Sequence, residues 1–163
     1  MRIAIISDIH DNIPKLRSAL GMMNDVEQIV CCGDLCSPFI VKELGLGFAG
    51  PVHIVFGNND GDRFRLLEGA RKYRHLQIHG EFVELEVDGR RIAVNHFDNI
   101  GATMVASQSY DVVCFGHNHR YSVSKQGQTL VVNPGEIFGL LTGQSSFVIY
   151  DTKSGEATRV DVD

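Results

Sequence analysis

The stretch Ile3-Ala4-Ile5-Ile6-Ser7-Asp8-Ile9-His10 decides how this chain folds. Four apolar residues in a row, three of them β-branched, are typical of a strand that is buried on both faces. The run ends abruptly in a carboxylate, Asp8, and an imidazole, His10. Open α/β sheets bind their ligands beyond the carboxyl ends of their strands. The stretch therefore predicts a central strand that delivers two polar side chains to such an edge.

The same pattern recurs along the chain. Each time, a short apolar run leads into a cluster of glycine, acid, amide or imidazole residues. The later runs and the clusters that follow them are 29–32 with Gly33 and Asp34, 52–56 with Gly57, Asn58, Asn59 and Asp60, 92–94 with Asn95, His96, Phe97 and Asp98, 112–115 with Gly116, His117, Asn118 and His119, and 130–132 with Asn133, Pro134 and Gly135. We expect these clusters to share one rim of the fold.

Helical patterns separate the first three apolar runs. Residues 13–24 carry apolar side chains at spacings of three and four, and Asn12 stands where an N-cap is expected. Residues 38–45 and 61–73 also have helical patterns. The first half of the chain is therefore predicted to run β-α-β-α-β.

The second half is predicted to be mostly strand. Residues 81–87 alternate between apolar and polar types, and the Asp-Gly pair at 88–89 favours a hairpin turn. Two more hairpins are expected within 121–132 and 145–161, and one helix near 101–108. Such a mixture predicts two sheets packed face to face, with helices on the outside.

Length and composition narrow the classes of protein. A chain of 163 residues fits one domain, and no linker divides it, so we expect a single domain over residues 1–163. The net charge of −5 disfavours nucleic acid as a partner. The four cysteines contain no C-x-x-C pair and are expected to be buried thiols. No signal peptide or apolar run of about 20 residues is present, which predicts a cytoplasmic protein without a membrane segment.

Seven side chains on the predicted rim are of types that bind divalent transition metals. They are Asp8, His10, Asp34, Asn58, His96, His117 and His119. One tetrahedral site needs fewer ligands, so a carboxylate between two metals about 3.5–4 Å apart is expected. Asp34 is the candidate for that bridge because it is the only ligand at its strand end. The pairs 8/10 and 117/119 are each expected to point to one side of an extended segment.

The ordered set Asp-x-His, Gly-Asp, Gly-Asn-Asn-Asp, a lone His and Gly-His-x-His resembles the calcineurin-like metallophosphoesterase superfamily. Its small bacterial and archaeal phosphodiesterases are the most similar branch, and the resemblance runs from Asp8 to residues 133–135. It implies an α/β fold, a four-layer α-β-β-α sandwich of two mixed sheets. It also implies hydrolysis of phosphoesters, above all phosphodiesters, by a hydroxide that bridges two divalent metals.

The same resemblance divides the ligands between two metals. The first metal would take Asp8, His10, Asp34 and His119, and the second Asp34, Asn58, His96 and His117. Manganese is the favoured ion, while Ni, Fe, Zn, Co and Mg stay open. The expected partner is a small phosphoester substrate, and Asp34, Asn58 and Asp60 are the expected catalytic residues.

The chain departs from the family pattern at two places. Asn59 stands where many relatives have a histidine that protonates the leaving oxygen, and an amide cannot act as a general acid. The chain is therefore expected to prefer esters with good leaving groups. Phe97 and Asp98 replace a usual Gly-His pair and are expected to shape the substrate pocket. The expected substrate-binding residues are Asn12, Asn59, Phe97 and Asp98.

Some residues have competing interpretations. Asp60 either acts near Asn58 and the leaving group or caps the helix that follows it. Asn12 is a helix cap first and a phosphate contact second. The basic cluster within 63–74 is expected to be a solvated helix face. Residues 138–141 suit either an interface of a homo-oligomer or ordinary core.

Two other functions remain open. One is a binding module on the same fold that has lost catalysis, as in a scaffold subunit of the eukaryotic retromer coat. A retired site tends to lose imidazoles, whereas all seven ligand positions are filled here. The other is a zinc hydrolase that attacks a non-phosphate ester.

Overall fold

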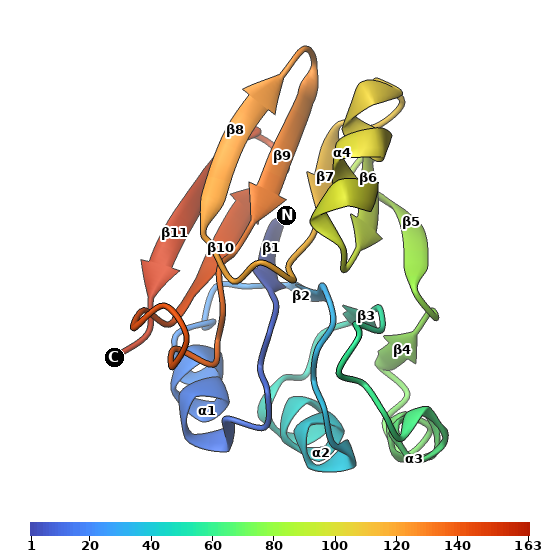
Figure 1. The fold of residues 1–163 in the computed structure, drawn as a ribbon, viewed down its shortest axis with the longest axis vertical. Coiled ribbons are helices and arrows are strands. Elements are labelled where there is room, and N and C mark those ends of the chain that lie inside the picture. Colours follow the sequence, from blue (N-terminus) through green and yellow to red (C-terminus); the bar gives the residue numbers. More distant parts are fainter.

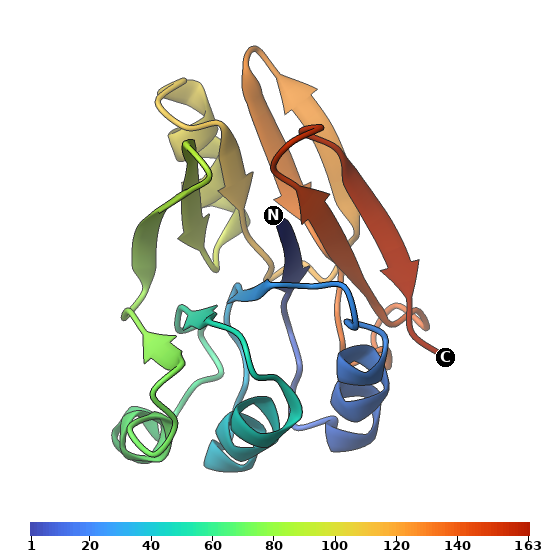
Figure 2. The ribbon, with the colours of Figure 1, turned by 180° about the vertical axis from the view of Figure 1, so that it is seen from behind.

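The computed structural model describes all 163 residues and folds them into two mixed sheets and four helices (Figures 1 and 2). The first sheet has the spatial order β11 (Ala157–Asp161), β10 (Ser146–Asp151), β1 (Arg2–Ile6), β2 (Gln28–Cys31), β3 (Val52–Ile54) and β4 (Leu76–Ile78). The second has the order β5 (Phe82–Val87), β6 (Arg90–Asn95), β7 (Val112–Cys114), β9 (Thr129–Asn133) and β8 (Ser122–Gln126). The helices are α1 (Ile13–Gly21), α2 (Pro38–Gly47), α3 (Arg63–Ala70) and α4 (Asp98–Ala106).

The strands that carry the predicted clusters run parallel. In the first sheet β1, β2, β3 and β4 are parallel neighbours, and β10 and β11 join the β1 edge antiparallel. In the second sheet β6, β7 and β9 are parallel, while β5 and β8 flank them antiparallel. The carboxyl ends within each parallel set therefore lie side by side.

Three apolar clusters hold four layers together. Alternate residues of β1 face opposite ways: Ala4 and Ile6 pack toward α1, α2 and α3, whereas Ile3 and Ile5 pack between the two sheets. A third cluster joins the outer face of the second sheet to α4. Figures 1 and 2 show α1, α2 and α3 in a row on one side of the sheets and α4 on the other. The predicted α-β-β-α sandwich is confirmed.

Element boundaries were predicted less well than the layers. The helix near 101–108 begins earlier, at Asp98, because the chain turns into it directly after the β6 cluster. The helix predicted over 61–73 spans only Arg63–Ala70, and Asp62 caps it by accepting a hydrogen bond from Arg65 N. The capping role considered for Asp60 is therefore wrong. Strand β4 was not predicted, because it is a three-residue edge strand with one buried side chain.

The three hairpins and the cap of α1 agree with the sequence. Asp88 and Gly89 take φ angles of 50° and 72°, which is the left-handed turn that an Asp-Gly pair favours. Asn12 accepts a hydrogen bond from Lys15 N, as an N-cap does. No helix is long and apolar enough to cross a membrane.

Two histidines pair on neighbouring strands at the edge of the first sheet. His53 Nδ1 lies 2.9 Å from His79 Nε2, and the rings stack. Burial lowers the pKa of both imidazoles, and the charge of His79 lowers that of His53 further. The pair is therefore neutral in the folded protein at pH 7.

This pair predicts a loss of stability in acid. A histidine in the unfolded chain titrates near pH 6.5. Below that pH the unfolded chain binds protons that the folded pair does not bind, which favours unfolding. The contribution of the neutral pair to the free energy of unfolding is therefore complete above about pH 6.5, and it is lost as the pH falls below that value. Urea unfolding at pH 7.0 and 5.0 should show a smaller pH dependence in the double variant His53→Gln/His79→Gln than in the wild type. Equal dependence in the wild type and the double variant would contradict the prediction.

Candidate metal centre

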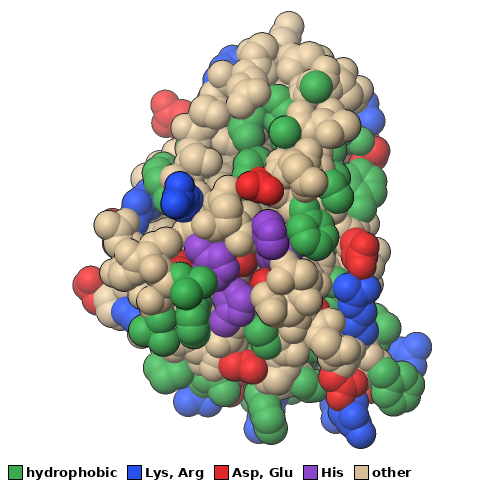
Figure 3. Space-filling view, in the orientation of Figure 1, with side chains coloured by type: hydrophobic (Ala, Val, Ile, Leu, Met, Phe, Trp, Pro, Cys, Tyr) green, Lys and Arg blue, Asp and Glu red, His purple; other side chains and the backbone are tan.

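The predicted rim exists, and backbone hydrogen bonds hold its loops together. The loop after β1 lies on the loop after β2, with Ile9 N donating to Asp34 O at 2.9 Å. The loop after β9 joins them, because Phe138 N donates to Asp8 O at 2.9 Å. Figure 3 shows histidine side chains gathered near the middle of this face, with acidic side chains among them. Residues far apart in the sequence thus meet at one place.

Five of the seven predicted ligands have a left-handed backbone. The φ angles are 52° at Asp8, 43° at His10, 56° at Asp34, 69° at His117 and 61° at His119. A non-glycine residue in this region is destabilised by roughly 1–2 kcal/mol. The extended segments predicted for the two pairs are therefore wrong. Sharp turns still bring Asp8 and His10 together, while His119 lies near Asp8 and His117 contacts His96.

Glycines at the strand ends allow the close approach of these loops. A Cβ atom added at Gly116 would lie against the Asp8 carboxylate, and one added at Gly57 would overlap the Asp34 carboxylate. The glycines that precede the polar clusters therefore serve the site directly, because any side chain there would displace a ligand.

Asp8, His10 and His119 form one group of converging ligand atoms. Asp8 Oδ1 lies 3.4 Å from His119 Nε2 and 3.8 Å from His10 Nε2. Asp8 Oδ1 and His10 Nε2 are buried and have no hydrogen-bond partner in the chain. Buried polar atoms without partners are rare, so these two atoms point to a ligand between them. The set fits the first metal position implied by the sequence.

Asp34 lies between the two halves of the site. Its Oδ2 atom is 3.5 Å from His10 Nε2 on one side and 3.4 Å from His96 Nε2 on the other. Burial alone would raise the pKa of Asp34, but hydrogen bonds from His96 and Asn59 outweigh it and hold that pKa well below its usual value. Asp34 is therefore an anion at neutral pH, in the position expected of a shared ligand.

His96 is oriented toward Asp34 by the backbone. Its Nδ1 atom lies 2.7 Å from Cys32 O, so the other nitrogen, Nε2, faces the site. Nε2 also lies 3.1 Å from Asn58 Oδ1, so two ligands predicted for the second metal are adjacent. His117 is exposed and lies outside both converging groups, but its ring contacts that of His96 with centroids 5.1 Å apart.

The charge balance of the centre favours cations. Asp8, Asp34 and Glu136 are all buried, and the chain gives none of them an ion pair with lysine or arginine. Buried carboxylates are costly unless they are paired or bind a metal. Carboxylate, imidazole and amide oxygen are donors for divalent transition metals. The residues present therefore fit metal ions at this centre.

Sequence reasoning missed Glu136. Its Oε2 atom lies 2.6 Å from His119 Nδ1, and its Oε1 atom accepts from the N and Oγ1 atoms of Thr142, both at 2.8 Å. A carboxylate on the far nitrogen of a metal-binding histidine fixes the orientation of the ring and makes it a better ligand. The available signal was an acidic residue directly after the Asn-Pro-Gly turn that ends an apolar strand.

Replacing Glu136 by glutamine should weaken metal binding about 10- to 100-fold, because the amide no longer holds His119 as a carboxylate does. Titration of metal-free protein with Mn²⁺ by isothermal calorimetry measures this change. Glu86→Gln, on the exposed face of β5, is the matched control and should bind Mn²⁺ like the wild type. Equal affinities for Glu136→Gln and wild type would rule out the orienting role.

Two residues of the Gly-Asn-Asn-Asp cluster support Asp34 and its loop. The Asp60 carboxylate is buried and accepts from the backbone N atoms of Asp34, Cys36 and Gly57, at 3.0, 2.9 and 2.7 Å. Asn59 donates to Asp34 twice, from its backbone N and from its Nδ2, each at 2.8 Å. Both residues therefore position the loop around Asp34. The predicted catalytic role of Asp60 and substrate contact of Asn59 stay predictions.

The other predicted substrate residues also border the centre. Phe97 packs its ring against those of His96 and His117, with centroids 5.2 and 5.1 Å apart. Asp98 accepts from Asn118 Nδ2 at 3.2 Å and so ties α4 to the loop after β7. Asn12 donates to Phe138 O at 2.7 Å in addition to capping α1. Contact of Phe97, Asp98 and Asn12 with a substrate stays a prediction.

The cysteines do not contribute a cluster of metal ligands. Cys31, Cys32 and Cys114 are buried free thiols, as predicted. Burial raises the pKa of all three, so they are inert neutral groups of the core. The prediction of a buried thiol is wrong for Cys36, which is partly exposed in the loop after β2 and lies 3.5 Å from His10 Nδ1.

Known proteins resemble this chain over nearly all of its length. A family model for the calcineurin-like phosphoesterase superfamily domain matches residues 1–155. Phosphodiesterase MJ0936 of Methanocaldococcus jannaschii is 36% identical over 160 residues, which cover 96% of each chain. A solved archaeal phosphodiesterase superposes with a TM-score of 0.93 at 34% identity, covering 99% of this chain and 100% of the other.

A more distant structure shares the fold alone. Wild-type Vps29 of Entamoeba histolytica, solved with zinc, has a TM-score of 0.69 at 18% identity and covers 100% of both chains.

Proposed function

Since this chain belongs to the calcineurin-like phosphoesterase superfamily, we propose that it hydrolyses phosphodiesters with two divalent metal ions at the centre described above. One observation carries the proposal: a single oxygen of Asp34 lies within 3.5 Å of histidine nitrogens from both halves of the site. A carboxylate so placed suits a ligand shared by two ions. The proposed ligands are those named from the sequence, with Asp8, His10 and His119 on one side and Asn58, His96 and His117 on the other. Manganese is the proposed ion.

Bound together, the two ions would lower the pKa of a water that attacks phosphorus and would offset charge on the phosphoryl oxygens. The chain itself supplies orientation. Cys32 O and Glu136 fix the rings of His96 and His119, while Asn59 holds the Asp34 carboxylate. The attack breaks one P–O bond and releases an alcohol or phenol.

No histidine directly follows Asn58 in the sequence to protonate the leaving oxygen. Asn59 occupies that position, and its side-chain amide already donates to Asp34. Loss of a general acid lowers the rate of hydrolysis about 10²- to 10⁴-fold for esters with poor leaving groups, and it has little effect on esters with good ones. We therefore propose phosphodiesters with acidic leaving groups as the preferred substrates.

Hydrolysis of bis(p-nitrophenyl) phosphate tests this function. Metal-free protein supplied with Mn²⁺ should release p-nitrophenolate, excess EDTA should stop the release, and phosphate should compete with the substrate. The alternatives are a catalytically inactive binding module and a hydrolase of non-phosphate esters. Absence of turnover with Mn²⁺, Ni²⁺, Co²⁺, Zn²⁺ and Mg²⁺ would favour the first, and turnover of carboxylic esters alone would favour the second.

A further inference from the structure

A second polar cavity adjoins the metal centre. It has a volume of about 330 Å³ and shares the ligand His119 with the centre. Arg120, Tyr121, Gln144 and Arg159 line it, and no acidic side chain does. Figure 3 shows basic side chains beside the histidine cluster, toward the side where β8 and β11 lie in Figure 1. The proposed metal-dependent function leaves this cavity and its two arginines unused.

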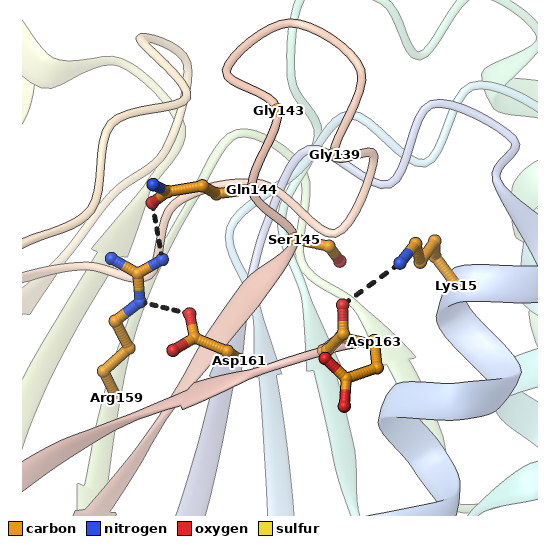
Figure 4. Close-up of a pocket in the computed structure, with 9 residues that line it drawn as sticks. Lys15, Gly139, Gly143, Gln144, Ser145, Arg159, Asp161 and Asp163 are labelled. Carbon is orange, nitrogen blue, oxygen red and sulfur yellow. Dashed lines mark hydrogen bonds and ion pairs between the residues drawn. The ribbon is translucent and has the colours of Figure 1, made fainter.

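Arg159 is held in place from three sides. Its Nε atom donates to Asp161 at 2.7 Å, one terminal nitrogen donates to Gln144 Oε1 at 2.8 Å, and its guanidinium lies 4.8 Å from the centre of the Tyr121 ring. Figure 4 shows this guanidinium between Gln144 and Asp161, with its other terminal nitrogen directed away from both. A positioned guanidinium with spare donors loses little freedom when it binds an anion.

Arg120 carries an uncompensated charge. Eight of the ten arginines pair with a carboxylate, and the exceptions are Arg120 and Arg74. Arg120 directly follows the candidate ligand His119, and both residues line this cavity. Planar guanidinium groups bind phosphate through paired hydrogen bonds. Arg74, in the loop after α3, offers the same exposed and unpaired group away from the centre.

We propose that this cavity, which we call the arginine pocket, binds a second phosphate group of the substrate. The inference rests on the proposed function and narrows it: the preferred substrates are phosphodiesters that carry an additional terminal phosphate. Arg120 and the free terminal nitrogen of Arg159 hold that phosphate while the diester lies over the metal centre. The cavity is within the size range of small-molecule sites and has room for a nucleoside portion beside the phosphate.

Two matched substrates test the arginine pocket. Thymidine 5′-(p-nitrophenyl phosphate) has one phosphate, and its 3′-phosphorylated form has a second, while both release the same p-nitrophenolate. The wild type with Mn²⁺ should have a kcat/KM about tenfold or more higher for the 3′-phosphorylated substrate. Arg120→Gln should bring that ratio close to one and leave turnover of bis(p-nitrophenyl) phosphate, which has one charge, unchanged. Arg74→Gln should keep the wild-type ratio.

A binding measurement separates this inference from the proposed function. Calorimetry on the Mn²⁺-loaded protein should show tighter binding of thymidine 3′,5′-bisphosphate than of thymidine 5′-phosphate, by about tenfold, and Arg120→Gln should abolish the difference. Turnover of bis(p-nitrophenyl) phosphate without any preference for the second phosphate would overturn the pocket and leave the proposed function standing. An Arg120-dependent binding preference without any turnover would support the arginine pocket and overturn the proposed function. A preference that Arg74→Gln removes equally would also overturn the pocket.

Discussion

Replacing Asp34 by asparagine should lower kcat/KM for bis(p-nitrophenyl) phosphate by about a thousandfold or more. Asparagine keeps the shape of the side chain, but it removes the anionic charge and turns one ligand atom into an N–H donor. That donor would face His10 and His96, whose nitrogens both lie within 3.5 Å of Asp34 Oδ2. The shared position between the two halves of the site is then lost, while the surrounding loops keep their backbone contacts.

The matched control is Asp62→Asn, an isosteric change at the exposed N-cap of α3. It should leave activity unchanged and lower stability slightly. Circular dichroism checks that both variants fold, and elemental analysis after gel filtration counts bound manganese. Asp34→Asn should retain less than the wild type. Full activity with a full metal content in this variant would exclude Asp34 as a shared ligand.

Saturating the metal-free protein with Mn²⁺ should raise its melting temperature by about 5–10 °C. Ligand at about 100 times its Kd stabilises by about 2.7 kcal/mol, and 1 kcal/mol shifts a domain of this size by roughly 2–4 °C. The physical reason lies in the buried carboxylates of Asp8, Asp34 and Glu136, which repel one another and form no ion pair with a lysine or an arginine. Bound cations attract these carboxylates and offset their mutual repulsion, which stabilises the folded protein.

The Mn²⁺-dependent increase in melting temperature should become larger as the pH rises. The nearby carboxylate of Asp8, 3.8 Å from His10 Nε2, together with Cys36, raises the pKa of His10 to about 10 in the metal-free protein. His10 is therefore protonated at neutral pH, and a metal ion must displace that proton to bind Nε2. Raising the pH makes this displacement easier, so the apparent metal affinity increases.

Differential scanning fluorimetry at pH 6.5 and 8.0, with Mn²⁺ or with EDTA, measures both effects. The Mn²⁺-dependent shift should be larger at pH 8.0. The double variant His53→Gln/His79→Gln, which alters histidines outside the centre, should show the wild-type shift at each pH. A shift that is absent, or that decreases between pH 6.5 and 8.0, would contradict the prediction.

The layers, and the meeting of the candidate ligands at one rim, were predictable from local sequence because both follow from strand ends. Runs such as residues 3–6 identify buried strands, and parallel strands deliver the side chains that follow them to one edge. The geometry within the loops was not predictable in this way. The left-handed turns at Asp8 and His117 depend on loops from distant parts of the chain packing against one another. The spacing of two residues within the pairs 8/10 and 117/119 does not predict that packing.

Glu136 and β4 were missed for different reasons. Glu136 acts through His119, so its role appears only once the fold brings their loops together. Strand β4 is short and has a single buried residue, Leu76, which leaves almost no periodic pattern to detect. The role of Asp60 was not predictable for a third reason. Its carboxylate accepts hydrogen bonds from backbone N atoms of two different loops, whereas the sequence near it suggested only a helix cap.

The metal centre takes side chains from both sheets, and this determines when it can form during folding. Asp8, Asp34 and Asn58 follow strands of the first sheet, whereas His96 and His119 follow strands of the second, and Glu136 comes later still. A nascent chain therefore has no complete centre until its last third has left the ribosome and the two sheets have docked. Metal ions would then stabilise only those molecules whose two sheets have docked, because the ligands are not together before that step.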